Sequence, residues 1–216
     1  VFRLGTAESI LWGRSHCVTC QHVLEWDELL PVASFAMLGG KCRVCHSPIS
    51  LQYPIVELLT AVTFSLIYIS YQNATFLASP LIVFGGLPLQ ADSANIFWYA
   101  GGLLFYFLAS TLLLAVAIYD FRTKIIAPAL MQPFFILALI GLAARWFSGA
   151  ALAEIVATVI AAILVFVFFA GLWFFSKGRA MGFGDAELAS ATILFLGASY
   201  GVTALLFAFW LGALFG

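Results

Sequence analysis

Two aspartates could carry acid–base chemistry in this chain. Asp120 ends an apolar run in the sequence IYDFR, and Asp185 begins another in the sequence GFGD. Two carboxyl groups that face each other can share one proton, because two like charges at short distance do not both form. The neutral group can then polarise a peptide carbonyl while the ionised group activates water. The pair therefore predicts hydrolysis of a peptide bond.

Each aspartate also has an ordinary structural interpretation. Asp120 could end a helix at the headgroup level beside basic residues, and Asp185 could be an N-cap after a glycine-rich loop. These structural interpretations are weaker when both aspartates are considered together, because ionisable groups near the hydrocarbon are costly and usually functional. Gly182 and Gly184 would also let backbone approach closely, as an extended substrate in a membrane cleft requires.

Four cysteines form two Cys-x-x-Cys pairs with 21 residues between them: Cys17, Cys20, Cys42 and Cys45. This pattern is typical of a structural zinc ion held by four thiolates, which joins two distant segments. A polar segment this small has too few apolar residues for a core and needs such a crosslink. Two disulfides are the alternative, which a reducing compartment disfavours. Three histidines could serve as ligands instead, but we expect them to flank the site: His16, His22 and His46.

The composition shows what must position these residues. Of 216 residues, 64% are hydrophobic and 9% charged, whereas soluble domains carry about 25% charged residues. This excludes an ordinary soluble enzyme, a disordered chain and a nucleic-acid binder built on basic patches, and it leaves an all-α polytopic membrane protein. We expect about six spans, the last two meeting near Gly201, at 54–72, 97–119, 126–146, 152–176, 185–200 and 202–216. The chain starts without Met and stops inside an apolar run, so we expect truncation at both ends.

The basic residues predict the orientation of the spans. If residues 1–50 lie in the cytoplasm, alternation places eight of the nine Lys and Arg residues on that side and only Arg145 outside. Such an excess of basic residues inside is the rule in membrane proteins. Both aspartates then lie at the same cytoplasmic depth. We expect two domains, a cytoplasmic zinc-binding head over 1–50 and a transmembrane helical protease domain over 51–216.

These motifs resemble a known family. GFGD is similar to the GxGD signature of intramembrane aspartyl proteases. The head resembles the cytoplasmic domain of bacterial type IV prepilin peptidases (leader peptidase/N-methyltransferases) in the order of its motifs: CVTC at 17–20, LPV at 30–32, GKCRVC at 40–45 and YPIVE at 53–57. The segment from Asp120 to Pro128 resembles the motif of their first catalytic aspartate. The resemblance covers nearly the whole chain.

The resemblance implies a function. Family members cleave the basic leader from type IV pilins and from pseudopilins of secretion systems at the cytoplasmic face of the bacterial inner membrane. Many then methylate the new N-terminus with S-adenosylmethionine. By resemblance, Asp120 and Asp185 would be the catalytic pair, the four cysteines would bind structural zinc, and three residues would support the site: Gly182, Gly184 and Glu57.

The chain departs from the family pattern at four positions, one of which is the proline after the first aspartate, displaced by about one residue to Pro128. Val18 stands where the family often has proline, and Ala129 stands where the family usually has Asn or Asp. Glu187 stands where Lys is common two residues after the second aspartate, so it would place a third carboxylate near the pair. None of these departures removes a catalytic residue.

Three alternative classes share some of these features. The chain also resembles presenilins and signal peptide peptidases, but the PAL sequence at 128–130 precedes the GxGD motif here and follows it there. A proton-coupled transporter would use the two aspartates as a relay, but no inverted repeat is evident. A non-catalytic scaffold with a zinc head is the third alternative. Loss of leader cleavage on replacing either aspartate by Asn would distinguish the protease from both.

Overall fold

The computed structural model describes residues 13–72, 96–179 and 181–215. The described part is helical and contains no strand beyond two isolated β-bridges, His16–Val23 and Lys41–Pro48. Its elements are a 3-10 turn (Asp27–Leu29) followed by α1 (Ala33–Met37), α2 (Gln52–Gln72), α3 (Ile96–Thr123), α4 (Pro128–Phe147), α5 (Leu152–Ser176), α6 (Phe183–Leu196) and α7 (Ala198–Phe215). Contacts divide the chain within α2 into two units, Val1–Leu66 and Ile67–Gly216.

The first unit contains two turns of the same design. In each Cys-x-x-Cys pair, the N–H of the first cysteine donates to the carbonyl five residues later, at 2.8 Å for Cys17 and 2.9 Å for Cys42. The residue after each pair, Gln21 or His46, has a positive φ of 59° or 55°, which closes the turn. The sequence thus builds the same tight turn twice, and each turn presents two thiols.

Four helices, α2 to α5, are long and apolar enough to cross a membrane. They confirm the predicted spans at 54–72, 97–119, 126–146 and 152–176, and the chain is a multi-pass membrane protein. The last two predicted spans are also helical. However, α6 has only 14 residues, fewer than the roughly 20 that a full crossing needs.

The junction between the last two helices lies at Gly197, not near Gly201 as predicted. Gly197 has a φ of +89°, a conformation that favours glycine. Carbonyl groups at the end of α6, those of Leu194 and Phe195, accept hydrogen bonds from the Arg145 guanidinium. Gly201 instead lies inside α7, where a Cβ would come within 2.7 Å of the Ile193 Cα. Its role is close packing of α7 on α6.

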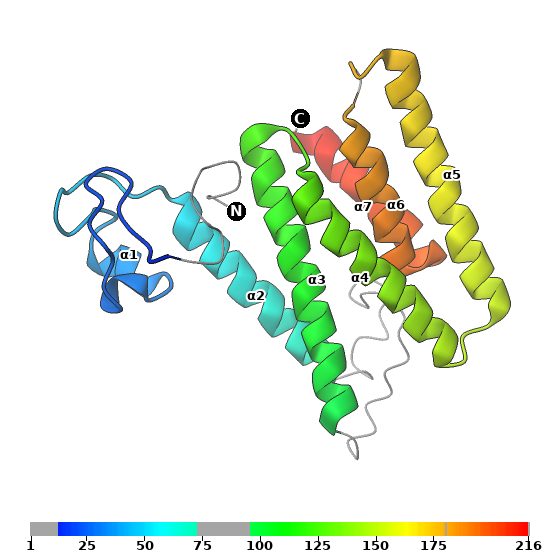
Figure 1. Cartoon of the computed structure of the whole chain (residues 1–216), viewed down its shortest axis with the longest axis horizontal. Coiled ribbons are helices and arrows are strands. Elements are labelled where there is room, and N and C mark those ends of the chain that lie inside the picture. The colour runs from blue at the N-terminus through cyan, green and yellow to red at the C-terminus, as the bar shows by residue number, and fades with distance from the viewer. Residues whose placement is uncertain (1–12, 73–95, 180, 216) are drawn as a thin grey trace. The chain divides into compact units, whose positions relative to one another are not determined.

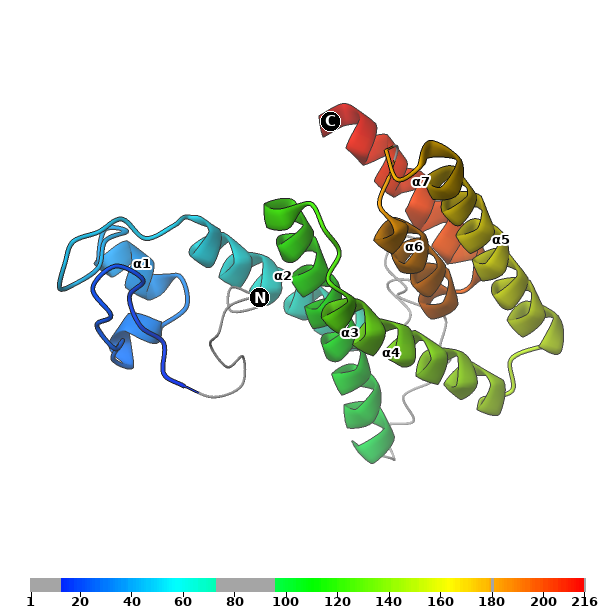
Figure 2. The same ribbon diagram turned by 45° about the horizontal axis from the view of Figure 1, so that its top comes forward.

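Helix α6 is the centre of the second unit. It packs against α4, α5 and α7, and Figures 1 and 2 show it lying among them. Half of its 14 residues are buried, among them Ala186, Ala191 and Ile193, which are fully enclosed. Phe134 and Ala138 of α4 are equally buried in the same core. A buried α6 gives Asp185, in its first turn, a fixed position.

Candidate active site and candidate metal centre

Asp120 lies in the last turn of α3 and is half-buried. The Lys124 N–H donates to the Asp120 carbonyl at 2.7 Å, and Lys124 takes a positive φ of 55°. This turn ends α3, and Pro128 begins α4 with a ring that suits the first helical turn. The carboxyl group of Asp120 is thereby held at the end of the helix next to the loop 124–127.

Asp185 lies in the first turn of α6 and is also half-buried. Its Oδ2 accepts a hydrogen bond of 3.0 Å from the Gly182 N–H. In return its own N–H donates to the Gly182 carbonyl at 3.3 Å. Gly182 is therefore the N-cap, and Asp185 lies three residues inside it, where free helical N–H groups favour negative charge. The structural alternative, in which Asp185 is the N-cap, is therefore wrong, because the N-cap lies three residues earlier, at Gly182.

A close contact joins the loops that carry the two aspartates. A Cβ on Gly184 would lie 2.7 Å from the Ile126 Cβ, a separation at which one of the two must move. The chain segment before Asp185 therefore packs directly on the loop after Asp120. The structure thus brings together the two segments that carry the aspartates singled out by the sequence.

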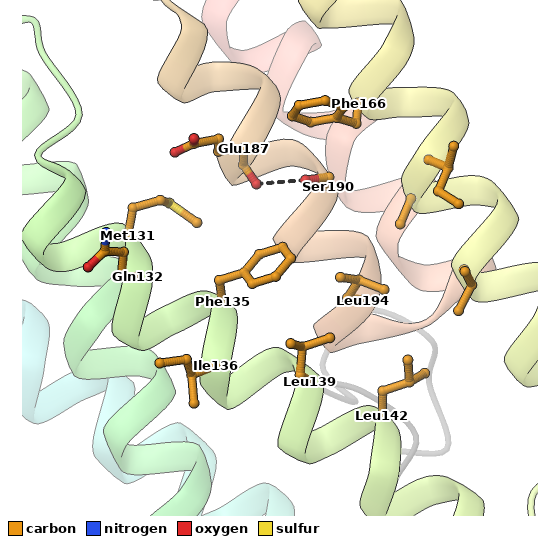
Figure 3. Close-up of a pocket in the computed structure, with 13 residues that line it drawn as sticks. Met131, Gln132, Phe135, Ile136, Leu139, Leu142, Phe166, Glu187, Ser190 and Leu194 are labelled. Carbon is orange, nitrogen blue, oxygen red and sulfur yellow. Dashed lines mark hydrogen bonds between the residues drawn. The ribbon is translucent and has the colours of Figure 1, made fainter.

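An apolar pocket of about 690 Å³ lies between α4, α5 and α6. Figure 3 shows Phe135, Leu139 and Leu194 along it, with Glu187 and Gln132 toward one end. Sequence reasoning missed this pocket, because its walls are ordinary apolar residues on three separate helices. Glu187 was the one available signal, since it is a carboxylate where a basic residue is usual.

The four cysteine thiols form one cluster in the first unit. Their Sγ atoms all lie within 4.8 Å of one another, with 3.8 Å between Cys17 and Cys45 and 3.9 Å between Cys20 and Cys42. Four sulfurs about 2.3 Å from a tetrahedral metal ion are separated by about 3.8 Å. All four are free thiols. The cluster therefore fits a metal ion.

Nearby groups lower the pKa of Cys17 and Cys45 and so favour their thiolate forms, whereas burial and the neighbouring thiols raise the pKa of Cys20 to about 11. The backbone N–H groups of Cys20 and Thr19 lower the pKa of the Cys17 thiol to about 6, and thiolates are the form that binds metal. The Ser47 hydroxyl lies 3.1 Å from the Cys45 Sγ and 3.8 Å from the Cys17 Sγ. Sequence reasoning missed Ser47, although its place two residues after the second pair was a usable signal.

A buried carboxylate supports the head beside the cysteines. The Glu28 side chain is 1% exposed and lies 3.1 Å from the His22 Nε2. The Glu25 N–H, which donates to Glu28 at 2.9 Å, lowers the pKa of Glu28 most, followed by His22 and Arg43. His22 therefore contacts Glu28, in agreement with its predicted place beside the cysteine site.

Glu57 connects α2 to the head. Its Oε2 accepts a hydrogen bond of 2.7 Å from the N–H of Val32, a β-branched residue with a φ of +59°. Such a conformation is strained for a β-branched residue and needs support from its surroundings. Glu57 provides this support, so the contact points to a structural role within the first unit.

Two family profiles match the chain. The bacterial peptidase A24 N-terminal domain matches residues 1–71. The type IV leader peptidase family matches residues 106–216, more than half of the chain. No solved structure matches it.

Curated relatives match over most of the chain. A prepilin leader peptidase/N-methyltransferase of Klebsiella pneumoniae is 30% identical over 193 residues, covering 88% of this chain and 71% of the relative. The protein of the same name from Burkholderia pseudomallei is 32% identical over 85% of this chain, and the Bacillus subtilis one is 28% identical over 96%. The match covers 51% of the length of the Burkholderia relative. A shorter match covers 19% of the length of a relative from Myxococcus xanthus. The chain therefore belongs to the type IV leader peptidase family.

Proposed function

We propose that this chain is an intramembrane aspartyl endopeptidase that removes the basic leader from type IV prepilins and pseudopilins. The observation that carries the proposal is the contact of Gly184 with Ile126, which packs the segment before Asp185 on the loop after Asp120, at the ends of apolar helices. Its membership of the leader peptidase family and the names of its relatives support the same activity.

In the proposed reaction, one carboxyl group of the pair is ionised and the other is protonated. The ionised group takes a proton from water as the water oxygen attacks the scissile carbonyl carbon. The protonated group donates a hydrogen bond to the carbonyl oxygen, which gains negative charge. The C–N bond then breaks, and the leaving nitrogen takes the proton. One water is consumed, and the pair returns to its shared-proton state.

The proposed location is the bacterial inner membrane, with the head and the catalytic pair on the cytoplasmic side. The support is the distribution of basic residues, most of which fall in the head, in the last turn of α3 and in the loops after α3 and α5. Arg145, the one basic residue predicted outside, is 1% exposed. Its guanidinium binds carbonyl groups at the end of α6, so its position is no argument against this orientation.

We also propose that the cysteine cluster holds a structural zinc ion through Cys17, Cys20, Cys42 and Cys45. Four thiolates leave no open coordination position, so the ion would fix the fold of the head and supply no catalytic group. S-adenosylmethionine-dependent methylation, which the relatives' names include, stays a prediction for this chain. None of the described residues marks out a site for that cofactor.

Cleavage of a prepilin-like peptide tests the proposed function. The full chain is placed in lipid with a peptide that carries a cationic leader, a scissile bond and an apolar segment. We expect a leader-sized fragment, and a decrease in rate of about 10²–10⁴-fold in Asp120→Asn or Asp185→Asn. Glu154→Gln is the control, because Glu154 is an exposed carboxylate in the first turn of α5, at the opposite end of the span from Asp185. Absence of the fragment with zinc present would refute the proposal.

A further inference from the structure

The pocket between α4, α5 and α6 has one charged residue among those that line it, Glu187. Its other lining residues are apolar except for Gln132 and Ser190, and the Ser190 hydroxyl donates to the Glu187 backbone carbonyl at 2.9 Å, as Figure 3 shows. The Glu187 carboxylate itself takes part in no hydrogen bond or ion pair within the described part of the chain. A half-buried carboxylate beside an apolar surface is costly unless a cation pairs with it.

Glu187 lies at the same end of α6 as Asp185, although side chains two residues apart project from different sides of a helix. Glu187 lies two residues after Asp185 in α6, about 3 Å further along the helix axis. Figure 3 shows it toward one end of the pocket, with Phe135, Leu139 and Leu194 along the rest. The pocket therefore offers a site for a cationic group near Asp185. From there an apolar surface continues away from Asp185.

We propose that Glu187 determines substrate specificity, by pairing with the leader's cationic residue nearest the scissile bond while the pocket takes the substrate's apolar segment. The inference rests on the proposed peptidase function. The occupant follows from complementarity of charge and polarity, because it must carry a cation next to an apolar stretch and must reach Asp185. An electrically neutral lipid chain would leave the Glu187 carboxylate without its partner.

The charge part of the proposal is tested with three peptides in lipid. They differ only at the leader position nearest the scissile bond, which is Lys, Gln or Glu. In the unmodified chain we expect kcat/KM for the Lys peptide to exceed that for the Gln peptide about tenfold, the effect of one partly buried ion pair. Glu187→Gln should bring this ratio close to one, and Glu187→Lys should reverse the order so that the Glu peptide is preferred.

The control and the contrary results separate this proposal from the proposed function. Glu154→Gln, which removes an exposed carboxylate that does not line the pocket, should leave the ratio unchanged. A uniform decrease for all three peptides in the Glu187 variants would indicate only a structural role and would overturn the proposal. Unchanged ratios would overturn it as well, while leader cleavage itself would stand. Absence of cleavage in the unmodified chain would refute both.

The apolar part of the proposal is tested with a matched pair of variants in α4. Leu139 lines the pocket, whereas its neighbour Ile140 does not, and both are about half exposed at 44% and 52%. Leu139→Trp should raise KM about tenfold for a peptide with a full apolar segment and leave a peptide with a shortened segment unaffected. Ile140→Trp should change neither. Equal effects of the two variants on the long peptide would overturn the pocket assignment.

Discussion

At the scale of single residues, Gly184 sets the distance between the two loops of the proposed active site. A Cβ there would lie 2.7 Å from the Ile126 Cβ, whereas a Cβ on Gly182 would meet only the Asp185 Oδ2, at 3.6 Å. The first distance requires a shift of the loop or of α6, and the second is an ordinary contact. The two glycines of GFGD therefore have different roles, since Gly182 caps α6 through its N–H and Gly184 allows close packing.

Alanine at each glycine tests this difference. Gly184→Ala should destabilise the second unit by about 1–3 kcal/mol through overpacking. It should also lower leader cleavage by about 10²-fold, because a shift of about 1 Å misplaces Asp185. Gly182→Ala should retain most of the activity. Cleavage rates and thermal unfolding of both variants check the prediction, and equal losses would show that the contact with Ile126 is not the cause.

At the scale of elements, α6 is held at both ends by other parts of the second unit. Its first turn packs on the loop before α4 through Gly184. At its last turn, the Arg145 guanidinium of α4 donates to carbonyls that Gly197 leaves outside the helical pattern. The Thr158 hydroxyl of α5 accepts a hydrogen bond of 3.2 Å from the Ala198 N–H, at the start of α7. The break between α6 and α7 therefore has its own hydrogen-bond partners in α4 and α5.

Arg145→Met tests the support at the end of α6. Loss of the guanidinium leaves buried carbonyl groups unpaired, at a cost of about 1–3 kcal/mol. We expect a lower thermal unfolding midpoint and faster proteolysis near Gly197. Arg179→Met is the matched control, because Arg179 is exposed and lies outside the helices, and its unfolding midpoint should stay unchanged. An unchanged midpoint in Arg145→Met would contradict the assigned role.

At the scale of the whole molecule, the two units are stabilised in different ways. The second unit has an apolar core that includes Phe134, Ala138 and Ile193. In the head, Cys42 is the one buried hydrophobic residue among the described residues 13–50. A segment with so little core depends on crosslinks. The cysteine cluster and the Glu28 contacts supply them, so the head should depend on metal and the second unit should not.

Metal removal tests this dependence. With a zinc chelator we expect proteolysis within residues 13–50 to accelerate while the helical content of the membrane helices is retained. Re-addition of zinc should restore protection, and metal analysis should give one zinc per chain. A head that stays protected in the chelator, or that contains no zinc after purification, would contradict the prediction.

Much of this arrangement could be predicted from the sequence, for identifiable physical reasons. Span positions follow from long apolar runs, and Cys-x-x-Cys spacing alone predicts paired thiols. The contact between Gly184 and Ile126 joins residues distant in the chain, so no local pattern indicates it. Charge counting predicts a side of the membrane for Arg145 but not its burial, and the structure shows its guanidinium buried against the end of α6. The helix break was misplaced because two glycines lie close together and only the tertiary contacts of Gly197 distinguish them.

The most direct test of the central claim compares the two aspartates singly and together. Leader-cleavage rates are measured for Asp120→Asn, Asp185→Asn and the double variant in lipid. If the carboxyl groups act as one unit, each single variant loses about as much activity as the double variant. A single variant that retains substantial cleavage, or losses that multiply in the double variant, would contradict the shared-proton pair.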